Sequence, residues 1–160
     1  MEDTKEYSPL TVIVKSAIVH TVTYFLIGLL ALTLFDYAAK YADPIVGGLM
    51  RQTNDPLVAA GPLFQIVRGV LFGIVVFLLR DIVLARQKGW LILWLPTWFH
   101  FVGLPEVLLQ SFLLSFLTFY WVNHPHRKIL NWAFGIAFVI VVVFGALGVL
   151  AGLGILQTPG

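Results

Sequence analysis

Arg68 carries the strongest chemical signal in this chain. It lies about six residues, or about 9 Å along a helix, inside an apolar run that begins at Pro62. A guanidinium at that depth is costly in lipid and is normally paired with an acceptor from a neighbouring segment. We therefore predict a polar site around Arg68 under one membrane surface. Its other members would be Gln65, Glu106, Gln110 and Asp36.

Two interpretations of this group are open at the level of sequence. The first is a structural ion pair that fixes helix register, or an arginine that reaches outward to lipid phosphates. The second is a small polar cavity that binds an anion, a lipid headgroup or a transported solute. Gly69, directly after Arg68, suits both, because a glycine permits a second helix to approach closely.

His20 and His100 form a second candidate site. If both runs cross the bilayer, the two imidazoles lie about 12 to 15 Å from the inner boundary, on different helices. Two histidines at matched depth could ligate a b-type haem or relay protons. The more ordinary interpretation is that each imidazole hydrogen-bonds within the bundle. We therefore expect no cofactor and keep haem b as the alternative.

Motifs that would dictate a reaction are missing from the sequence. It contains no G-x-S-x-G, H-E-x-x-H, P-loop or dinucleotide fingerprint, and no cysteine for thiolate chemistry. His124-x-His126 has basic neighbours and no nearby carboxylate, so we interpret it as a solvated turn and predict no metal site. The formal charge of +2 is too small to indicate nucleic acid as a partner. These features favour a non-catalytic protein over an enzyme.

The elements that must position these residues are membrane helices. The chain of 160 residues is 59% hydrophobic and 11% charged, whereas soluble domains carry about 25% charged residues. We predict an all-α integral membrane protein with a single transmembrane domain, residues 1–160, and the lipid bilayer as its environment. Five transmembrane helices are expected, at about residues 12–35, 62–79, 90–104, 107–122 and 129–156.

The third and fourth runs are the shortest. They contain about fifteen and sixteen residues, and a full crossing needs about 20. An alternative architecture therefore has three full spans and a re-entrant hairpin formed by residues 90–122. A hairpin returns the chain to the side from which it entered, so both architectures orient the other helices identically.

Lysine and arginine placement predicts the orientation. With a cytoplasmic N-terminus, most basic residues fall on the inner side, as positive-inside proteins require. The C-terminus then lies outside. The inner residues are Lys5, Lys15, Arg80, Arg86, Lys88, Arg127 and Lys128, against Lys40 and Arg51 outside.

Small residues predict close helix packing at two places. Gly69-x-x-x-Gly73 lies in the second run and Gly148-x-x-x-Gly152 in the last, with Gly145 one turn earlier. Such spacing lets helix backbones approach in lipid. The motif is typical of ordinary packing within one chain, and self-association through the last helix is the alternative.

Three segments carry a resemblance to a protein family: residues 62–72, 89–94 and 104–110. Their sequences, PLFQIVRGVLF, GWLILW and LPEVLLQ, resemble a group of uncharacterised bacterial multi-spanning membrane proteins. This resemblance implies the inner (plasma) membrane of a bacterium and adds interest to Arg68 and Glu106. It brings no activity with it.

Together these features predict an accessory, scaffold or lipid-interacting subunit of a membrane assembly, with a second copy or another membrane protein as partner. A small oligomeric transporter or channel, with Gln65, Arg68 and Glu106 lining its pathway, is the first alternative. A membrane redox subunit that carries haem between His20 and His100 is the second.

Overall fold

Helices make up all the regular structure that the described part of the chain contains. The computed structural model describes residues 7–34, 44, 58, 60–100 and 105–152, with the backbone alone at 96–100, 105, 106 and 152. The all-α prediction is confirmed. The helices are α1 (Pro9–Leu34), α5 (Gly61–Leu78), α6 (Arg80–Val83), α7 (Gly89–His100), α8 (Pro105–Asn123) and α9 (Lys128–Gly152).

Three of these helices are long and apolar enough to cross a membrane. They are α1 with 26 residues, α5 with 18, and α9, of which Lys128–Ala151 qualifies. This agrees with the predicted membrane protein, and the count of five spans is not confirmed. Helix α7 has 12 residues, or about 18 Å, well short of a hydrocarbon core of about 30 Å.

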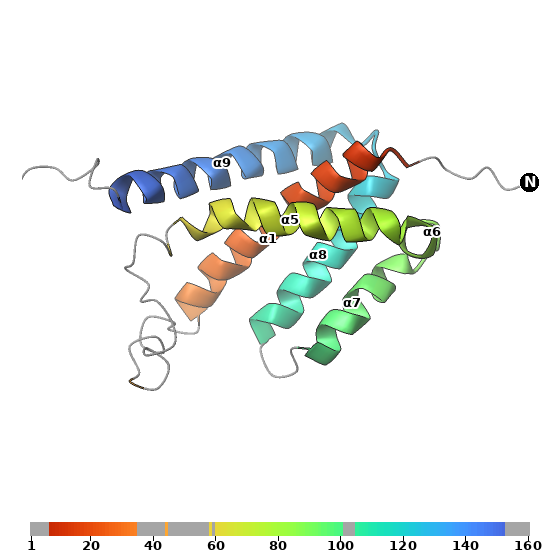
Figure 1. Ribbon diagram of the computed structural model, residues 1–160, viewed down its shortest axis with the longest axis horizontal. Coiled ribbons are helices and arrows are strands. Elements are labelled where there is room, and N and C mark those ends of the chain that lie inside the picture. Colours follow the sequence, from red (N-terminus) through yellow and green to blue (C-terminus); the bar gives the residue numbers. More distant parts are fainter. Residues whose placement is uncertain (1–6, 35–43, 45–57, 59, 101–104, 153–160) are drawn as a thin grey trace, which may run out of the picture.

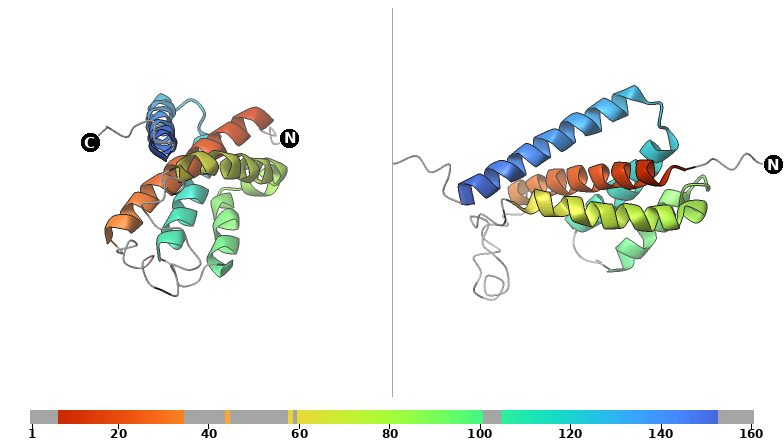
Figure 2. Two further views of the ribbon diagram at one scale, coloured as in Figure 1. Left: turned by 60° about the vertical axis from the view of Figure 1, so that its left-hand side comes forward. Right: turned by 45° about the horizontal axis from the view of Figure 1, so that its top comes forward.

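Helix α1 is the central element of the bundle. It packs against α5, α8 and α9, and α7 packs against α8. In Figures 1 and 2, α9 lies along one side of the α1–α5 pair, and the α7–α8 hairpin lies on the other. Residues of α1 are therefore the ones best placed to meet side chains from several other helices.

Two glycines set the contact between α1 and α5. A Cβ atom built on Gly69 would lie 2.8 Å from Cα and O of Ala17, and one on Gly73 would lie equally close to Ile13. Because backbone atoms cannot move aside as a flexible side chain can, only glycine fits at these two positions. The helices run antiparallel, so residues further along α5 contact residues nearer the start of α1. Gly145 of α9 in turn faces the side chain of Leu63.

Aromatic rings hold the α7–α8 hairpin together. Trp90 meets Phe112 and Phe116 edge-on, at ring-centroid distances of 5.6 and 5.8 Å. Trp94 meets Phe112 in the same way at 5.8 Å. Edge-to-face pairs of this kind add specific attraction to the area they bury, so the hairpin forms a unit that packs onto α1 through α8.

One end of the bundle, which we call the basic end, collects the helix termini and most of the described cations. The start of α1, the end of α5, the end of α8 and the start of α9 meet there (Figure 1). Apart from Arg68, every described lysine and arginine belongs to these segments or to the α5–α7 connection. They are Lys15, Arg80, Arg86, Lys88, Arg127 and Lys128.

Hydrogen bonds tie the elements of the basic end to one another. The Nζ of Lys15 donates to the carbonyl of Trp121 at 3.0 Å, in the last turn of α8, where carbonyls lack partners within the helix. A cation there also complements the negative end of the helix dipole. The Nε1 of Trp121 donates to Oδ1 of Asn131 in α9 at 2.6 Å. These bonds join α1, α8 and α9 at one level.

The hydroxyl of Tyr7 forms pH-sensitive hydrogen bonds at the same end. Its hydroxyl lies 2.7 Å from Oδ1 of Asn123 and 3.1 Å from the carbonyl of Leu84. Burial raises the pKa of Tyr7 above its ordinary value of about 10. The folded state thus favours the neutral phenol, and Tyr7 contributes stability that is present below about pH 10 and lost as the pH rises through its folded-state pKa.

We therefore expect the free energy of unfolding to fall more steeply above pH 10 in the native protein than in the Tyr7→Phe variant. The measurement is an unfolding titration in detergent between pH 8 and 11. Lysine deprotonation affects both proteins alike, so the difference between the two curves isolates Tyr7. Parallel curves would contradict the expectation.

Candidate functional site

A buried hydrogen bond joins α1 to α5 in the middle of the bundle. The Nε2 of His20 lies 3.3 Å from Oε1 of Gln65. His20 is 9% exposed and Gln65 is 6% exposed. With a hydrogen on Nε2, the imidazole donates this bond and its Nδ1 remains an acceptor. The ring also stacks on Phe72 of α5, with a centroid distance of 6.1 Å.

The glycines of α5 explain why this pair meets. Gln65 is one turn from Gly69, on the same face of α5, and His20 is one turn from Ala17 on α1. The close backbone approach at Gly69 and Ala17 therefore carries the next turn of each helix into side-chain contact. Polar side chains placed between helices in this way hydrogen-bond across the interface in lipid.

Three buried polar atoms have no hydrogen-bond partner within the part of the chain that the structure describes. They are Oγ of Ser16, Nδ1 of His20 and Oγ1 of Thr118. Other hydroxyls of α1 behave differently, since Thr21 donates to Ala17 O at 2.9 Å and Thr23 to Val19 O at 2.7 Å. Ser16 and Thr118 are fully buried, and neither makes such a bond back to its own helix.

Arg68 lies on the exposed side of α5, whereas its neighbour Gly69 is buried against α1. The residues around it on this side, Phe64, Val67 and Leu71, are exposed as well. Gln65, expected to share a site with Arg68, turns instead toward His20. Gln65 and His20 belong to two separate predicted sites, and their contact links these sites.

The remaining partners proposed for Arg68 stay predictions. Asp36 lies outside the described residues, and so does the side chain of Glu106. Gln110 is half-buried in α8, and no hydrogen bond among described residues joins it to Gln65 or Arg68. The pairing of Arg68 with Glu106 thus remains the expectation drawn from charge and depth.

The haem and proton-relay predictions are also untested, because the side chain of His100 is outside the described residues. The structure pairs Nε2 of His20 with Gln65, so an axial ligand at that atom would first have to leave the amide. An absorbance band near 400 nm in purified protein remains the direct test of haem.

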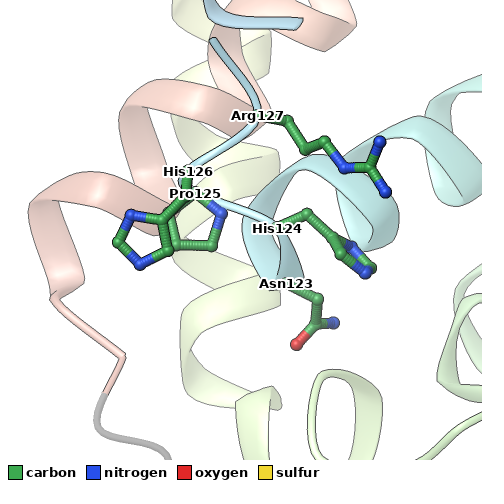
Figure 3. A pocket seen from close by; sticks show the side chains of 5 residues that line it. All are labelled: Asn123, His124, Pro125, His126 and Arg127. Carbon is green, nitrogen blue, oxygen red and sulfur yellow. The ribbon is translucent and has the colours of Figure 1, made fainter.

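A pocket of about 320 Å³ lies at the basic end, in the turn between α8 and α9. It is lined by Asn123, His124, Pro125, His126 and Arg127. His124 stacks on Tyr120 at 4.4 Å, and its Nδ1 lies 2.8 Å from the carbonyl of that residue. In Figure 3, His124 and Arg127 point to one side and His126 to the other, so the two imidazoles do not converge.

The buried hydroxyl residues were absent from the predicted sites, although the sequence carries a signal for them. Ser111, Ser115 and Thr118 are buried and follow one another at helical spacing, which places them on one face of α8. Ser16 and His20 have the same relation on α1. In an otherwise apolar chain, matched polar stripes of this kind indicate the faces on which two helices pack.

Comparison of the chain with protein-family models, curated proteins and solved structures gives no match. The chemistry of these residues alone therefore carries the functional conclusion.

Proposed function

We propose that this chain is a non-catalytic integral membrane protein that serves as an accessory or scaffold subunit of a membrane assembly, with α9 as the helix that contacts another membrane protein. The observation that carries the proposal is the exposure of α9. Only 11% of its most apolar 18-residue stretch is buried, against 44% for α1. Helix α9 is nonetheless anchored at the basic end through Asn131.

The exposed surface of α9 suits a partner helix. Its large apolar side chains follow a spacing close to a heptad, and a Cβ on Gly135 would meet nothing within 4 Å. A second helix can therefore approach there without displacing any described side chain. The exposed large residues are Ile129, Trp132, Ile136, Val139, Ile140, Val143, Phe144 and Leu147.

The proposed location is the plasma membrane of a bacterium, with the basic end and the N-terminus in the cytoplasm and the C-terminus outside. The gathering of lysine and arginine at one end supports this orientation. We further propose three full crossings, with the α7–α8 hairpin entering from the basic end and returning to it. The length of α7, about 18 Å, supports the hairpin over two more crossings.

Photocrosslinking from α9 tests the assembly proposal. The chain has no cysteine, so single cysteines at Ile136 and Val143 can each carry a benzophenone in native membranes. We expect both positions to capture the same discrete membrane protein. Leu71→Cys in α5, a position 60% exposed on another face, is the matched control and should yield only lipid adducts. Adducts with lipid alone at all three positions, or with a second copy of this chain, would contradict the proposal.

A second candidate function is a small transporter or channel. The buried His20–Gln65 pair and the unpartnered atoms beside it favour this reading, because polar groups inside a membrane bundle often mark a solute or proton pathway. Flux measured in vesicles that contain the purified protein, compared with the Gln65→Leu variant, distinguishes it from the scaffold. Flux that is absent from both would leave the scaffold as the better proposal.

A further inference from the structure

We propose that the interface between α1 and α8 is a binding site for internal water, held by Ser16, His20 and Thr118 in the interior of the membrane domain. The three atoms that would bind it are Oγ, Nδ1 and Oγ1, respectively. This site is distinct from the direct His20–Gln65 hydrogen bond, because that bond uses the other ring nitrogen of His20, Nε2.

The burial of these atoms calls for a partner. Ser16 and Thr118 are 0% exposed and His20 is 9% exposed. Buried polar atoms in folded proteins nearly always hydrogen-bond to protein or to ordered water, because leaving them unpaired costs free energy. Each hydroxyl can donate and accept, and a neutral Nδ1 can accept, which together match the three or so bonds that a buried water makes.

The register between α1 and α8 brings the three residues to the same region. Val12 and Val122 belong to one buried cluster near the basic end. The helices run in opposite directions, so one turn deeper into the bundle α1 presents Ser16 and α8 presents Thr118. One further turn along α1 is His20, level with Ser115.

One alternative partner within the protein, a backbone carbonyl of the same helix, is less suited to these hydroxyls. The carbonyl four residues earlier satisfies Thr21 and Thr23, yet Ser16 and Thr118 do not use it. The α8 stripe contains two serines, Ser111 and Ser115, whose side chains fill less of the interface than leucine or valine would. A small ligand that both donates and accepts hydrogen bonds fits such a surface, and water is such a ligand, present on both sides of every membrane.

Solid-state NMR of the full-length protein in lipid vesicles tests the site directly. With the protein labelled uniformly by ¹⁵N, magnetisation transferred from water should reach the His20 ring about as fast as it reaches the exposed His124 and His126. The His20→Gln variant assigns the signal. Transfer to His20 as slow as to apolar core residues would overturn the proposal.

Two single substitutions provide a second test of the site. We expect Thr118→Val, and separately Ser16→Ala, to slow water transfer to His20 at least threefold while leaving transfer to His124 unchanged. Thr33→Val, an exposed hydroxyl at the far end of α1, is the matched control and should have no effect. Unchanged transfer to His20 in both variants would show that these hydroxyls do not hold the water, and would overturn the assignment.

Discussion

Alanine at Gly69 is expected to destabilise the protein by about 1–3 kcal/mol, although alanine is the better helix former. The new Cβ would lie 2.8 Å from two backbone atoms of Ala17, a distance shorter than Cβ atoms adopt in real structures. Helices α1 and α5 would have to move apart, and the His20–Gln65 bond one turn away would lengthen with them. Gly69→Ala combined with Gly73→Ala should destabilise further, because both contacts lie on the same face.

The chain supplies matched controls for this experiment. Gly28 in α1 and Gly135 in α9 would each gain a Cβ that meets nothing within 4 Å. Alanine at either position should leave stability unchanged or raise it by up to about 1 kcal/mol, through helix propensity alone. Unfolding free energies measured in one detergent system compare the four variants. Equal values for Gly69→Ala and Gly28→Ala would refute the close α1–α5 approach.

Loss of the Gln65 amide should be the next most damaging change. Gln65→Leu leaves both ring nitrogens of a buried histidine without a described partner, at a cost of about 1–2 kcal/mol. Replacing both residues, as in His20→Leu with Gln65→Leu, removes the unsatisfied groups together. The double variant should therefore be more stable than the sum of the two single changes predicts.

A double-mutant cycle on unfolding free energies measures this coupling between His20 and Gln65. Gln110→Leu serves as the control, since Gln110 is half-buried in α8 and no described hydrogen bond joins it to Gln65. Its replacement should change stability by less than about 0.5 kcal/mol. Additive effects at His20 and Gln65 would mean that the hydrogen bond contributes nothing to stability.

The predicted spans agree with the helices of the structure where they are longest and most apolar. The first run was expected from residue 12 and α1 begins at Pro9, a residue that suits the first turn of a helix. The run at 62–79 matches α5, which has Pro62 in its first turn. The run at 90–104 agrees only in part: α7 covers Gly89–His100 and continues through Pro96, and residues 101–104 lie outside the described residues.

The candidate site was harder to predict, for a geometric reason. Arg68 and Gln65 are three residues apart, and helical spacing alone places them on neighbouring positions of one surface. Which of the two turns inward depends on where α1 lies, and Gly69 brings α1 to the Gln65 side. Arg68 is consequently exposed, and Gln65 meets a histidine 45 residues away.

The amino-acid sequence by itself determined that this protein is helical and suited to a lipid bilayer. The length of the apolar runs and the scarcity of charged residues are local properties, and they decide whether a helix is stable in lipid. It also determined where its cations gather. Only the tertiary structure decided which polar groups meet: His20 with Gln65, Tyr7 with Asn123, and Lys15 with the end of α8. These contacts depend on the register between the helices. Small residues such as Gly69 and Gly73 set that register, because they allow two helix backbones to approach closely.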